Sequence, residues 1–399
     1  MNGVHNIVIP AFEIILRGYP YMKAIINGKI ILEDKIIKDK VLVFDNEIEG
    51  IESCVSDSFE IIDAEDNYVS PGFIDMHIHG IKGNGFTLEY RETIHKTGES
   101  LPEFGVTGFL PTLVSEPRND MLEILKLIKG EVKKATGASI LGVHLEGPFI
   151  SSLYRGAHDE KNLYYPDTGD ILCHKDIIKM ITYAPELDEN NQFLKTIKGN
   201  SDIIMAMGHT NATFEEAQKA IYEGASHCTH IFNAMRHFDH REPGIIGAAL
   251  LQPVSVDIVA DMIHVNKELF QLLLNNKGKE SIALITDAIF AAGLEEGVYH
   301  YQGRDFYVKD GTIRLGDGKL AGSILTLNRA ADNFYKHTSL SVAETVGLIS
   351  KNPARILGID DKKGSLQKGL DADIVIFNDS FEIQRTIIEG NTVFCRQRA

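Results

Sequence analysis

Two histidines stand one residue apart at the end of an apolar run, in the segment PGFIDMHIHG (71–80). Alternate side chains of a β-strand share a face, so Asp75, His77 and His79 are predicted to point the same way. Three polar groups on one face of an apolar strand are unfavourable unless something binds them. Taken alone, the segment is explained equally well by a pair of hydrogen-bonded core histidines and by a metal site.

Other apolar runs of the chain also end on a histidine or a carboxylate. The residues at these ends are Glu146, His209, His230 and Asp287. Histidine, glutamate and aspartate are the ligands that a divalent metal of intermediate softness prefers. Core packing is a poor explanation for so many polar ends, because each buried charge would need its own partner.

The elements that would carry these residues form a regular series from residue 71 onward, in which short apolar runs alternate with amphipathic stretches. The predicted strands are 73–79, 106–112, 140–146, 180–185, 203–209, 226–230, 256–261 and 282–287. Helices are predicted between several of them, at 118–135, 211–225 and 266–276. Eight parallel strands with helical crossovers predict an α/β fold, a (β/α)8 TIM-type barrel. In such a barrel the carboxyl ends of the strands meet at one face. Six polar residues at these ends would therefore converge on a metal: His77, His79, Glu146, His209, His230 and Asp287.

Both ends of the chain show strand patterns without such crossovers. The first 65 or so residues contain an Asn-Gly turn between apolar runs, and the tail after residue 363 is again strand-like. A hairpin insertion is predicted at 305–323, followed by helices in 325–337 and 341–358. We therefore expect a small β-sandwich domain built from residues 1–66 and 352–399, beside a barrel of residues 67–351.

The acidic balance of the chain excludes several classes of partner. The formal net charge is −16, which argues against nucleic acid and against an anionic membrane as the main partner. The first ten residues lack the basic start and apolar core of a signal peptide, and no stretch approaches a membrane span. Four scattered cysteines form no CxxC pair, which suits a reducing compartment. A cytoplasmic protein is expected, and its metal would need histidine and carboxylate ligands.

A series of longer motifs narrows the interpretation. They are PGFIDMHIHG, GVTGFLPT, HLEGPFIS, GHTNAT, THIFNAM, HREPGIIGAAL, LITDA, LAGSILT and GSLQKGLDADIVIF. In this order, over most of the chain, the sequence resembles the N-acetylglucosamine-6-phosphate deacetylases of the amidohydrolase superfamily. HLEGP, FNAM and HREPG are the specific pieces, whereas HxH and TDA alone would indicate only the superfamily.

The resemblance implies a metal-dependent active site. Glu146, His209 and His230 would hold the main divalent metal, and three protein ligands leave an open position for water. Asp287 matches the family's general base, with a structural metal ligand as the alternative role. His77 and His79 would hold a second metal, which some family members have and others lack. Zinc, iron, manganese and cobalt are not distinguished, nor is one ion from two. The fourth strand offers no lysine at its end, which argues against a hydantoinase or a dihydroorotase.

The resemblance also implies a set of substrate contacts. His264 matches a histidine near the sugar and the acetamide carbonyl, where it would help to polarise that oxygen. Further sugar and phosphate contacts would come from Ala157, His158, Asn233, Ala234, Leu320, Ala321 and Gly322. Arg241 matches the phosphate-binding arginine that the family supplies from a neighbouring subunit, which implies a homodimer. An ordinary surface arginine and a loop histidine without a role are the alternatives for Arg241 and His158.

The predicted reaction is hydrolysis of N-acetylglucosamine 6-phosphate to glucosamine 6-phosphate and acetate, in amino-sugar catabolism. The same machinery would act on the galactosamine epimer, and none of the residues assigned here to the substrate separates the two sugars. A ring-opening amidohydrolase, a purine deaminase and a barrel without catalysis would also suit a barrel with polar strand ends. FNAM and HREPG count against the first two, and the intact set of six polar residues counts against the last.

Overall fold

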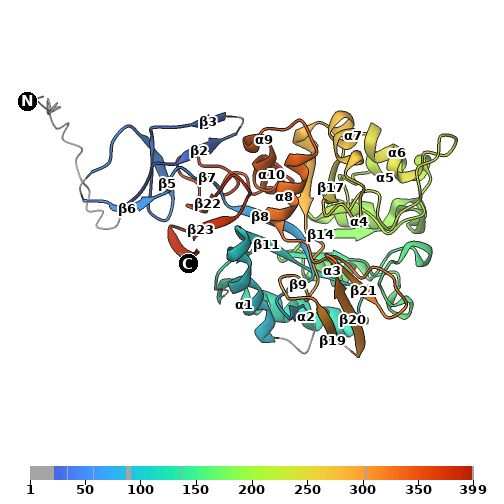
Figure 1. Cartoon of the computed structure of the whole chain (residues 1–399). Coiled ribbons are helices and arrows are strands. Elements are labelled where there is room, and N and C mark those ends of the chain that lie inside the picture. Colours follow the sequence, from blue (N-terminus) through green and yellow to red (C-terminus); the bar gives the residue numbers. More distant parts are fainter. Residues whose placement is uncertain are drawn as a thin grey trace, which may run out of the picture.

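The computed structural model of the chain describes residues 22–33, 35–56, 58–86, 91–134, 136–301 and 303–397. Residues 1–21, which belong to the predicted small domain and include the start of the chain, lie outside the described residues. Two β-sheets from the chain ends lie on one side of the molecule, and the barrel lies on the other (Figure 1).

In the described part of the chain, eight parallel strands form the barrel. They are β8 (Phe73–Ile78), β11 (Val106–Leu113), β13 (Val143–Glu146), β14 (Ile178–Tyr183), β15 (Ile204–Met207), β16 (His227–Cys228), β17 (Ser255–Val259) and β18 (Ile282–Ile285). Each pairs with the next in chain order. Every barrel strand predicted from the sequence is confirmed, and so is the barrel.

The barrel is nearly closed between its first and last strands, β8 and β18. At the carboxyl ends, Ile78 forms a parallel bridge with Ala288, and the Asp287 N–H donates to the carbonyl of His77 at 2.9 Å. Further down, the Ile74 N–H donates instead to the carbonyl of Ile349 at 2.7 Å. The segment that follows helix α9 (Val342–Gly347) therefore accepts from the Ile74 N–H, which no pairing between β8 and β18 satisfies.

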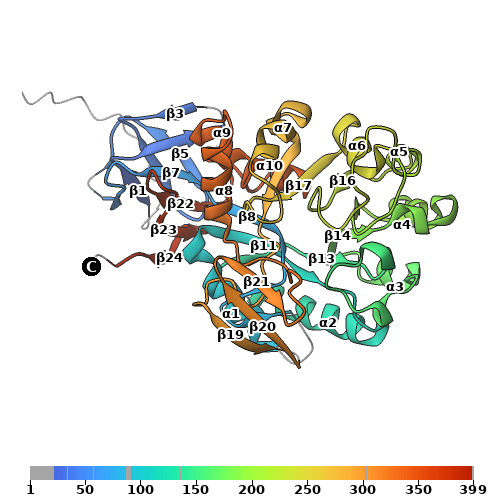
Figure 2. The same ribbon diagram turned by 45° about the vertical axis from the view of Figure 1, so that its right-hand side comes forward.

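Helices cover the outside of the barrel (Figure 2). They are α1 (Arg91–Ser100), α2 (Arg118–Glu131), α3 (Thr168–Cys173), α4 (Gln192–Asn200), α5 (Phe214–Tyr222), α6 (Gly244–Leu251), α7 (Glu268–Lys277), α8 (Leu327–Lys336), α9 (Val342–Gly347) and α10 (Lys351–Ile356). Helix α5 begins at a capping box in which Thr213 and Glu216 bond each other's backbone. Within the described residues, none of the helices combines the length and apolarity that a membrane crossing requires.

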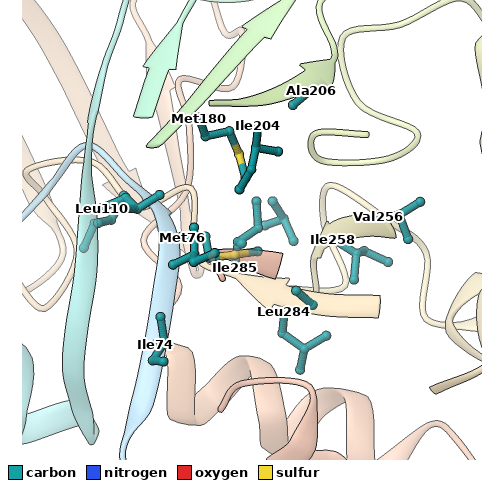
Figure 3. Packing of buried hydrophobic residues seen from close by; sticks show 14 of the residues in the cluster. Ile74, Met76, Leu110, Met180, Ile204, Ala206, Val256, Ile258, Leu284 and Ile285 are labelled. Carbon is teal, nitrogen blue, oxygen red and sulfur yellow. The ribbon is translucent and has the colours of Figure 1, made fainter. Parts of the chain in front are cut away.

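The interior of the barrel is filled by apolar side chains. Figure 3 shows this packing, with Met76, Leu110, Met180, Ile258 and Ile285 among the labelled residues. Each of these side chains is almost completely buried, which stabilises the fold by about 1.5–3 kcal/mol per large residue. The barrel is therefore a packed core and not a pore.

The chain ends contribute two further sheets, as the predicted β-sandwich requires. One sheet contains β5 (Ile48–Glu52), β4 (Val41–Phe44), β1 (Lys23–Ile26) and β6 (Glu60–Asp63). The other contains β24 (Asn391–Cys395), β23 (Ile383–Ile388), β22 (Ile374–Phe377), β7 (Tyr68–Pro71), β2 (Lys29–Leu32) and β3 (Lys35–Ile37). Strand β7 pairs with β2 and β22, so this sheet continues past residue 66. The domain boundaries themselves stay a prediction.

The hairpin predicted at 305–323 is part of a larger sheet. It contains β19 (Gly297–Tyr301), β20 (Arg304–Lys309) and β21 (Thr312–Leu315). Asp310 and Gly311 form the turn between β20 and β21, with φ values of 50° and 71°. This double positive φ is typical of the tight turns that Asp-Gly favours. The strand β19 was not predicted.

A buried ion pair ties together the C-terminal part of the chain. The Lys363 ammonium lies 2.7 Å from a carboxylate oxygen of Asp371 and 2.7 Å from one of Asp373.

Replacing Lys363 with Met is expected to lower the free energy of unfolding by about 3 kcal/mol, because Asp373 would keep a buried charge without its cation. Urea denaturation measures the change. Lys368→Met, which removes an exposed pair with Glu49, is the control and should cost under about 1 kcal/mol. Equal losses of unfolding free energy in the two variants would contradict the expectation.

Candidate active site

Three side chains from three different strand ends meet at one point above the barrel core. The Nε2 atoms of His209 and His230 lie 2.9 and 3.0 Å from the same oxygen, Oε1 of Glu146, and 3.1 Å from each other. All three side chains are buried. The sequence placed these residues at strand ends, and the structure brings them together as a group that could hold a metal ion.

His77 and His79 form a second group beside the first. Their Nε2 atoms are 3.1 Å apart, and they lie 3.4 and 3.3 Å from the two carboxylate oxygens of Glu146. Oδ1 of Asp287 lies 3.5 Å from His77 and 3.3 Å from His79. Glu146 thus belongs to both groups, as the ligand shared by two ions would.

Three of these residues are presented by tight turns. His209, His230 and Asp287 are each the second residue after their strand, β15, β16 or β18. Their φ values are 47°, 31° and 49°, in the left-handed region that side chains with a Cβ seldom occupy. The turns carry the side chains out of the strand direction and over the open end of the barrel.

Hydrogen bonds fix which imidazole nitrogens face the centre. Nδ1 of His209 lies 2.8 Å from the carbonyl oxygen of Tyr154, and Nδ1 of His79 lies 3.1 Å from that of Thr112. A carbonyl only accepts, so each Nδ1 carries a proton and each Nε2 faces the carboxylate of Glu146. There Nε2 donates when the ring is protonated, and it can bind a cation when the ring is neutral. A hydrogen bond from Nδ1–H to a backbone carbonyl is typical of histidines that bind a metal through Nε2.

The electrostatics of the cluster keep its carboxylates charged. Burial alone would raise the pKa of Glu146, but the surrounding histidines hold it well below its usual range. Burial also opposes ionisation of Asp287, whose pKa is nevertheless lowered, chiefly by its hydrogen bond to His79. For His77 the balance is reversed, and burial lowers its pKa to about 4. The site therefore combines anionic carboxylates with at least one neutral imidazole.

The donor set fits a divalent cation. Two imidazole nitrogens and a carboxylate oxygen form a triangle with edges of 2.9–3.1 Å. Metal–ligand bonds of 2.0–2.1 Å in a tetrahedral site would set these atoms about 3.3 Å apart, so small shifts suffice. Without a cation, the facing lone pairs of His209 and His230 would repel unless one ring were protonated. The number of ions and their identity remain predictions.

The expectation that Asp75 shares a face with the two histidines is wrong. Asp75 pairs with Phe109 and Ile78 pairs with Pro111, so β8 advances three residues while β11 advances two. This β-bulge breaks the alternation of side chains between Asp75 and His77. The carboxylate of Asp75 instead lies between β8 and the turn after β18, where Oδ2 accepts from Oγ1 of Thr286 at 2.7 Å.

The loop after β13 passes directly over the cluster and carries Ala157 and His158. Gly156 packs against His209 so closely that a Cβ there would lie 3.2 Å from its ring. Ala157 is exposed, whereas His158 is buried. Nδ1 of His158 accepts from the Ser115 N–H at 3.1 Å, so its Nε2–H donates to Oε2 of Glu146 at 3.1 Å. The ring of His158 therefore holds Glu146, and its predicted contact with a sugar stays a prediction.

The predicted phosphate contacts follow His230 in the chain. The Asn233 N–H donates to the carbonyl of His230 at 2.9 Å, and Ala234 accepts from the Thr210 N–H at 3.2 Å. Both residues thus belong to the turns that present the two histidines. Arg241 is different: its side chain is exposed, and no ion pair or side-chain hydrogen bond involves it among the described residues. The structure does not bring Arg241 into the cluster of its own chain.

The remaining predicted contacts lie around Asp287. Nδ1 of His264 lies 2.6 Å from Oδ2 of Asp261. Burial opposes the charged form of His264, yet this bond and the nearby charges of Asp261 and Asp287 raise its pKa. Leu320, Ala321 and Gly322 precede Ser323, whose N–H donates to the carbonyl of Asp287 at 3.0 Å. Their loop therefore adjoins the predicted base.

Sequence reasoning missed several polar residues that support the site. Nε2 of His144 lies 2.7 Å from Oγ1 of Thr182, and its ring packs edge-on against His77. His144 stands two residues before Glu146, so strand parity could have placed it inside the barrel. Glu186 and Asp257 were also missed. Their partners lie on neighbouring strands, and nothing in the local sequence identifies them.

Comparisons with known proteins agree with this architecture. The model of the amidohydrolase family matches residues 68–393. An N-acetylglucosamine-6-phosphate deacetylase from Bacillus subtilis is 36% identical over 395 residues, which cover 92% of this chain and 99% of the relative. The crystal structure of the corresponding enzyme from Pasteurella multocida superimposes with a TM-score of 0.87 at 29% identity, covering 93% of this chain and 99% of that one.

A further solved structure contains a sugar phosphate. It is a mutant N-acetyl-D-glucosamine-6-phosphate deacetylase from Mycobacterium smegmatis in complex with N-acetyl-D-glucosamine-6-phosphate. It is 27% identical, with a TM-score of 0.86, and the match covers 94% of this chain and 99% of that one. The chain therefore belongs to the amidohydrolase family, and within it to the N-acetylglucosamine-6-phosphate deacetylases.

Proposed function

We propose that the protein hydrolyses the acetamide of N-acetyl-D-glucosamine 6-phosphate, releasing D-glucosamine 6-phosphate and acetate. The observation that carries this proposal is the convergence of Glu146, His209 and His230 at the strand ends, with Asp287 beside them. The 36% identity to the deacetylase of Bacillus subtilis supports the choice of substrate.

Glu146, His209 and His230 would hold the main cation, and His77 with His79 would hold a second one. When bound, the cation supplies a water of lowered pKa as the nucleophile. Asp287 is anionic and lies at the edge of the cluster, where it would take a proton from that water. An amide nitrogen leaves poorly until it is protonated, so Asp287 would then deliver the same proton to the departing amine.

His264 would stabilise the charge that develops on the acetamide oxygen. Its Nδ1–H donates to Asp261, so the orientation of the ring is fixed and Nε2 is left for the substrate. The raised pKa of His264 favours the protonated form, in which Nε2–H is a donor. The fixed orientation of the His264 ring places this donor before the substrate binds.

The phosphate would be bound at a subunit boundary. The guanidinium of the exposed Arg241 makes no hydrogen bond or ion pair among the described residues of its own chain, as in a residue that reaches into a neighbouring site. We propose a homodimer in the cytoplasm in which each Arg241 grips the phosphate in the partner's site. A guanidinium binds phosphate through two parallel hydrogen bonds, which a lysine does not reproduce.

Arg241→Ala should raise KM for the phosphorylated sugar by roughly 10- to 100-fold, because a charge-assisted bidentate contact is lost. Turnover of unphosphorylated N-acetylglucosamine should stay unchanged. Steady-state kinetics on both sugars measure the split, and Arg385→Ala, on strand β23 of the terminal sheet, is the control. Equal loss on both sugars would exclude the phosphate role.

The test of the function itself is acetate release by metal-replete protein. We would compare N-acetylglucosamine 6-phosphate, its galacto epimer and unphosphorylated N-acetylglucosamine. Fast turnover of the first is expected. A preference for the galacto epimer would keep the chemistry and change the substrate, whereas no release from any of the three would overturn the proposal.

A further inference from the structure

Each of the three left-handed turns of the site is held by a carboxylate that lies on a neighbouring strand or just after it. The turns carry His209, His230 and Asp287. A residue with a Cβ stays in this conformation only where its surroundings determine it. Hydrogen bonds to a fixed acceptor are one such determinant.

Glu186 holds the turn of His209. It follows β14, the strand next to β15, and is half-buried. Its carboxylate accepts from Oγ1 of Thr210 at 2.5 Å and from the Asn211 N–H at 2.6 Å. Both donors directly follow His209, so movement of the turn would break both bonds.

Asp257 holds the turn of His230. It lies on β17, next to β16, and is completely buried. Its Oδ1 accepts from the backbone N–H of His230, and its Oδ2 accepts from Nε2 of His227 at 2.8 Å. The first of these bonds reaches the backbone of the same residue that carries the imidazole of the site. The other nitrogen of His227, Nδ1, lies 2.7 Å from Oγ of Ser255, so the carboxylate is itself anchored.

Asp75 holds the turn of Asp287. It lies on β8, which forms a bridge between Ile78 and Ala288 with the segment that follows β18. Its Oδ2 accepts from Oγ1 of Thr286 at 2.7 Å, and its Oδ1 accepts from the His77 N–H at 3.2 Å. Asp75 is completely buried. It therefore links the residue before the predicted base to the backbone of one histidine of the second group.

We propose that Glu186, Asp257 and Asp75 are positioning residues that set the orientation of His209, His230 and Asp287, respectively. The assignment of separate roles to the three turns rests on the proposed function. Each carboxylate acts through the turn it holds, so its loss changes a different property of the enzyme. Loss of the first two weakens metal binding, and loss of the third slows the proton transfers.

The hydroxyl groups of Thr210 and Thr286 allow the test, because Thr→Val keeps the branched shape and removes the bond to the carboxylate. The same change also removes the bond that each hydroxyl accepts inside its turn, from the Ala212 or the Ala288 N–H. Thr210→Val should weaken Zn²⁺ binding by the metal-free protein by roughly 10- to 100-fold, measured by titration against a competing chelator. Thr286→Val should bind Zn²⁺ within about threefold of the wild type, since its turn carries none of the three main ligands. At saturating Zn²⁺ and N-acetylglucosamine 6-phosphate, its kcat should fall by roughly 10- to 100-fold with little change in KM.

Further variants separate positioning from general stability. Thr196→Val removes a hydroxyl that bonds only within helix α4 and should change neither property. Thr210→Ser and Thr286→Ser keep the hydroxyl and should restore Zn²⁺ binding and kcat, respectively. For the carboxylate beside His230, Asp257→Ala should weaken Zn²⁺ binding, and Asp257→Asn, which keeps an acceptor for the His230 N–H, should restore most of it.

Thermal melting of each metal-free variant, followed by circular dichroism, reports on the fold. If Thr210→Val and Thr286→Val both melt earlier and neither shows its separate defect, the carboxylates have a structural role only and the proposal is wrong. If Thr210→Val fails to fold, Glu186→Gln replaces it in the Zn²⁺ titration, with the exposed Glu189→Gln as control. If Thr286→Val fails to fold, Asp75→Asn replaces it in the measurement of kcat. A wild type that binds Zn²⁺ but releases no acetate would overturn the function, and the Zn²⁺ titrations would still decide the positioning of the histidines.

Discussion

Asp287→Asn should lower kcat by about 10²- to 10⁴-fold, the usual contribution of a general acid–base group. Asparagine has almost the same shape but can neither take a proton from water nor give one to the amine. The expected loss is specific to the chemical step. KM should change little, because the Asp287 side chain lies beside His77 and His79 and the substrate contacts come from other loops.

A measurement of metal content and a control variant make this prediction decisive. Metal content, determined by elemental analysis of the dialysed variant, should equal that of the wild type if Asp287 is the base and the main cation is held by Glu146, His209 and His230. Loss of metal in proportion to the loss of kcat would assign Asp287 the alternative role of a ligand. Asp361→Asn, at an exposed position, is the matched control and should leave kcat unchanged.

Glu146→Gln should remove both metal and activity. Glu146 lies 2.9–3.0 Å from two imidazole nitrogens of one group and 3.3–3.4 Å from two of the other, so it is the common element of the candidate centre. A neutral amide is a poor ligand for a divalent cation. Loss of the carboxylate also leaves His158 without its anionic partner. We expect kcat/KM to fall by roughly 10³-fold or more, since a cation contributes several kcal/mol to such reactions.

The metal content of variants also counts the ions. His77→Ala with His79→Ala should lower the content from two ions per chain to one if both groups bind, and should leave it at one if the second group stays empty. Treatment of the wild type with a chelator should abolish acetate release, and added Zn²⁺ should restore it. Full activity of Glu146→Gln, or of the chelated enzyme, would exclude a metal centre at this position. Glu189→Gln, in the exposed loop after β14, serves as the control.

The barrel and the identity of most of the cluster could be predicted from the sequence because both depend on local patterns. Apolar runs of strand length recur with helical stretches between them, and parallel strands open their carboxyl ends at one face. Glu146, His209, His230 and Asp287 stand at or just after such ends, so their convergence followed from the fold alone. The strand β19 was missed because an exposed strand has a weaker sequence pattern than a buried one.

Only the tertiary structure decided how the cluster is held. The β-bulge in β8 turned Asp75 away from His77, and its position depends on pairing with β11, which no local pattern encodes. His158 lies on Glu146, and Glu186 and Asp257 bond turns on adjacent strands, across 24–27 residues of sequence. Contacts of this range are set by packing and by the need to satisfy buried polar groups. The sequence by itself predicted the residues at the strand ends that form the cluster, because that prediction needs only local patterns and the geometry of the barrel. The folded chain decided how these side chains are oriented and which other polar groups hold them.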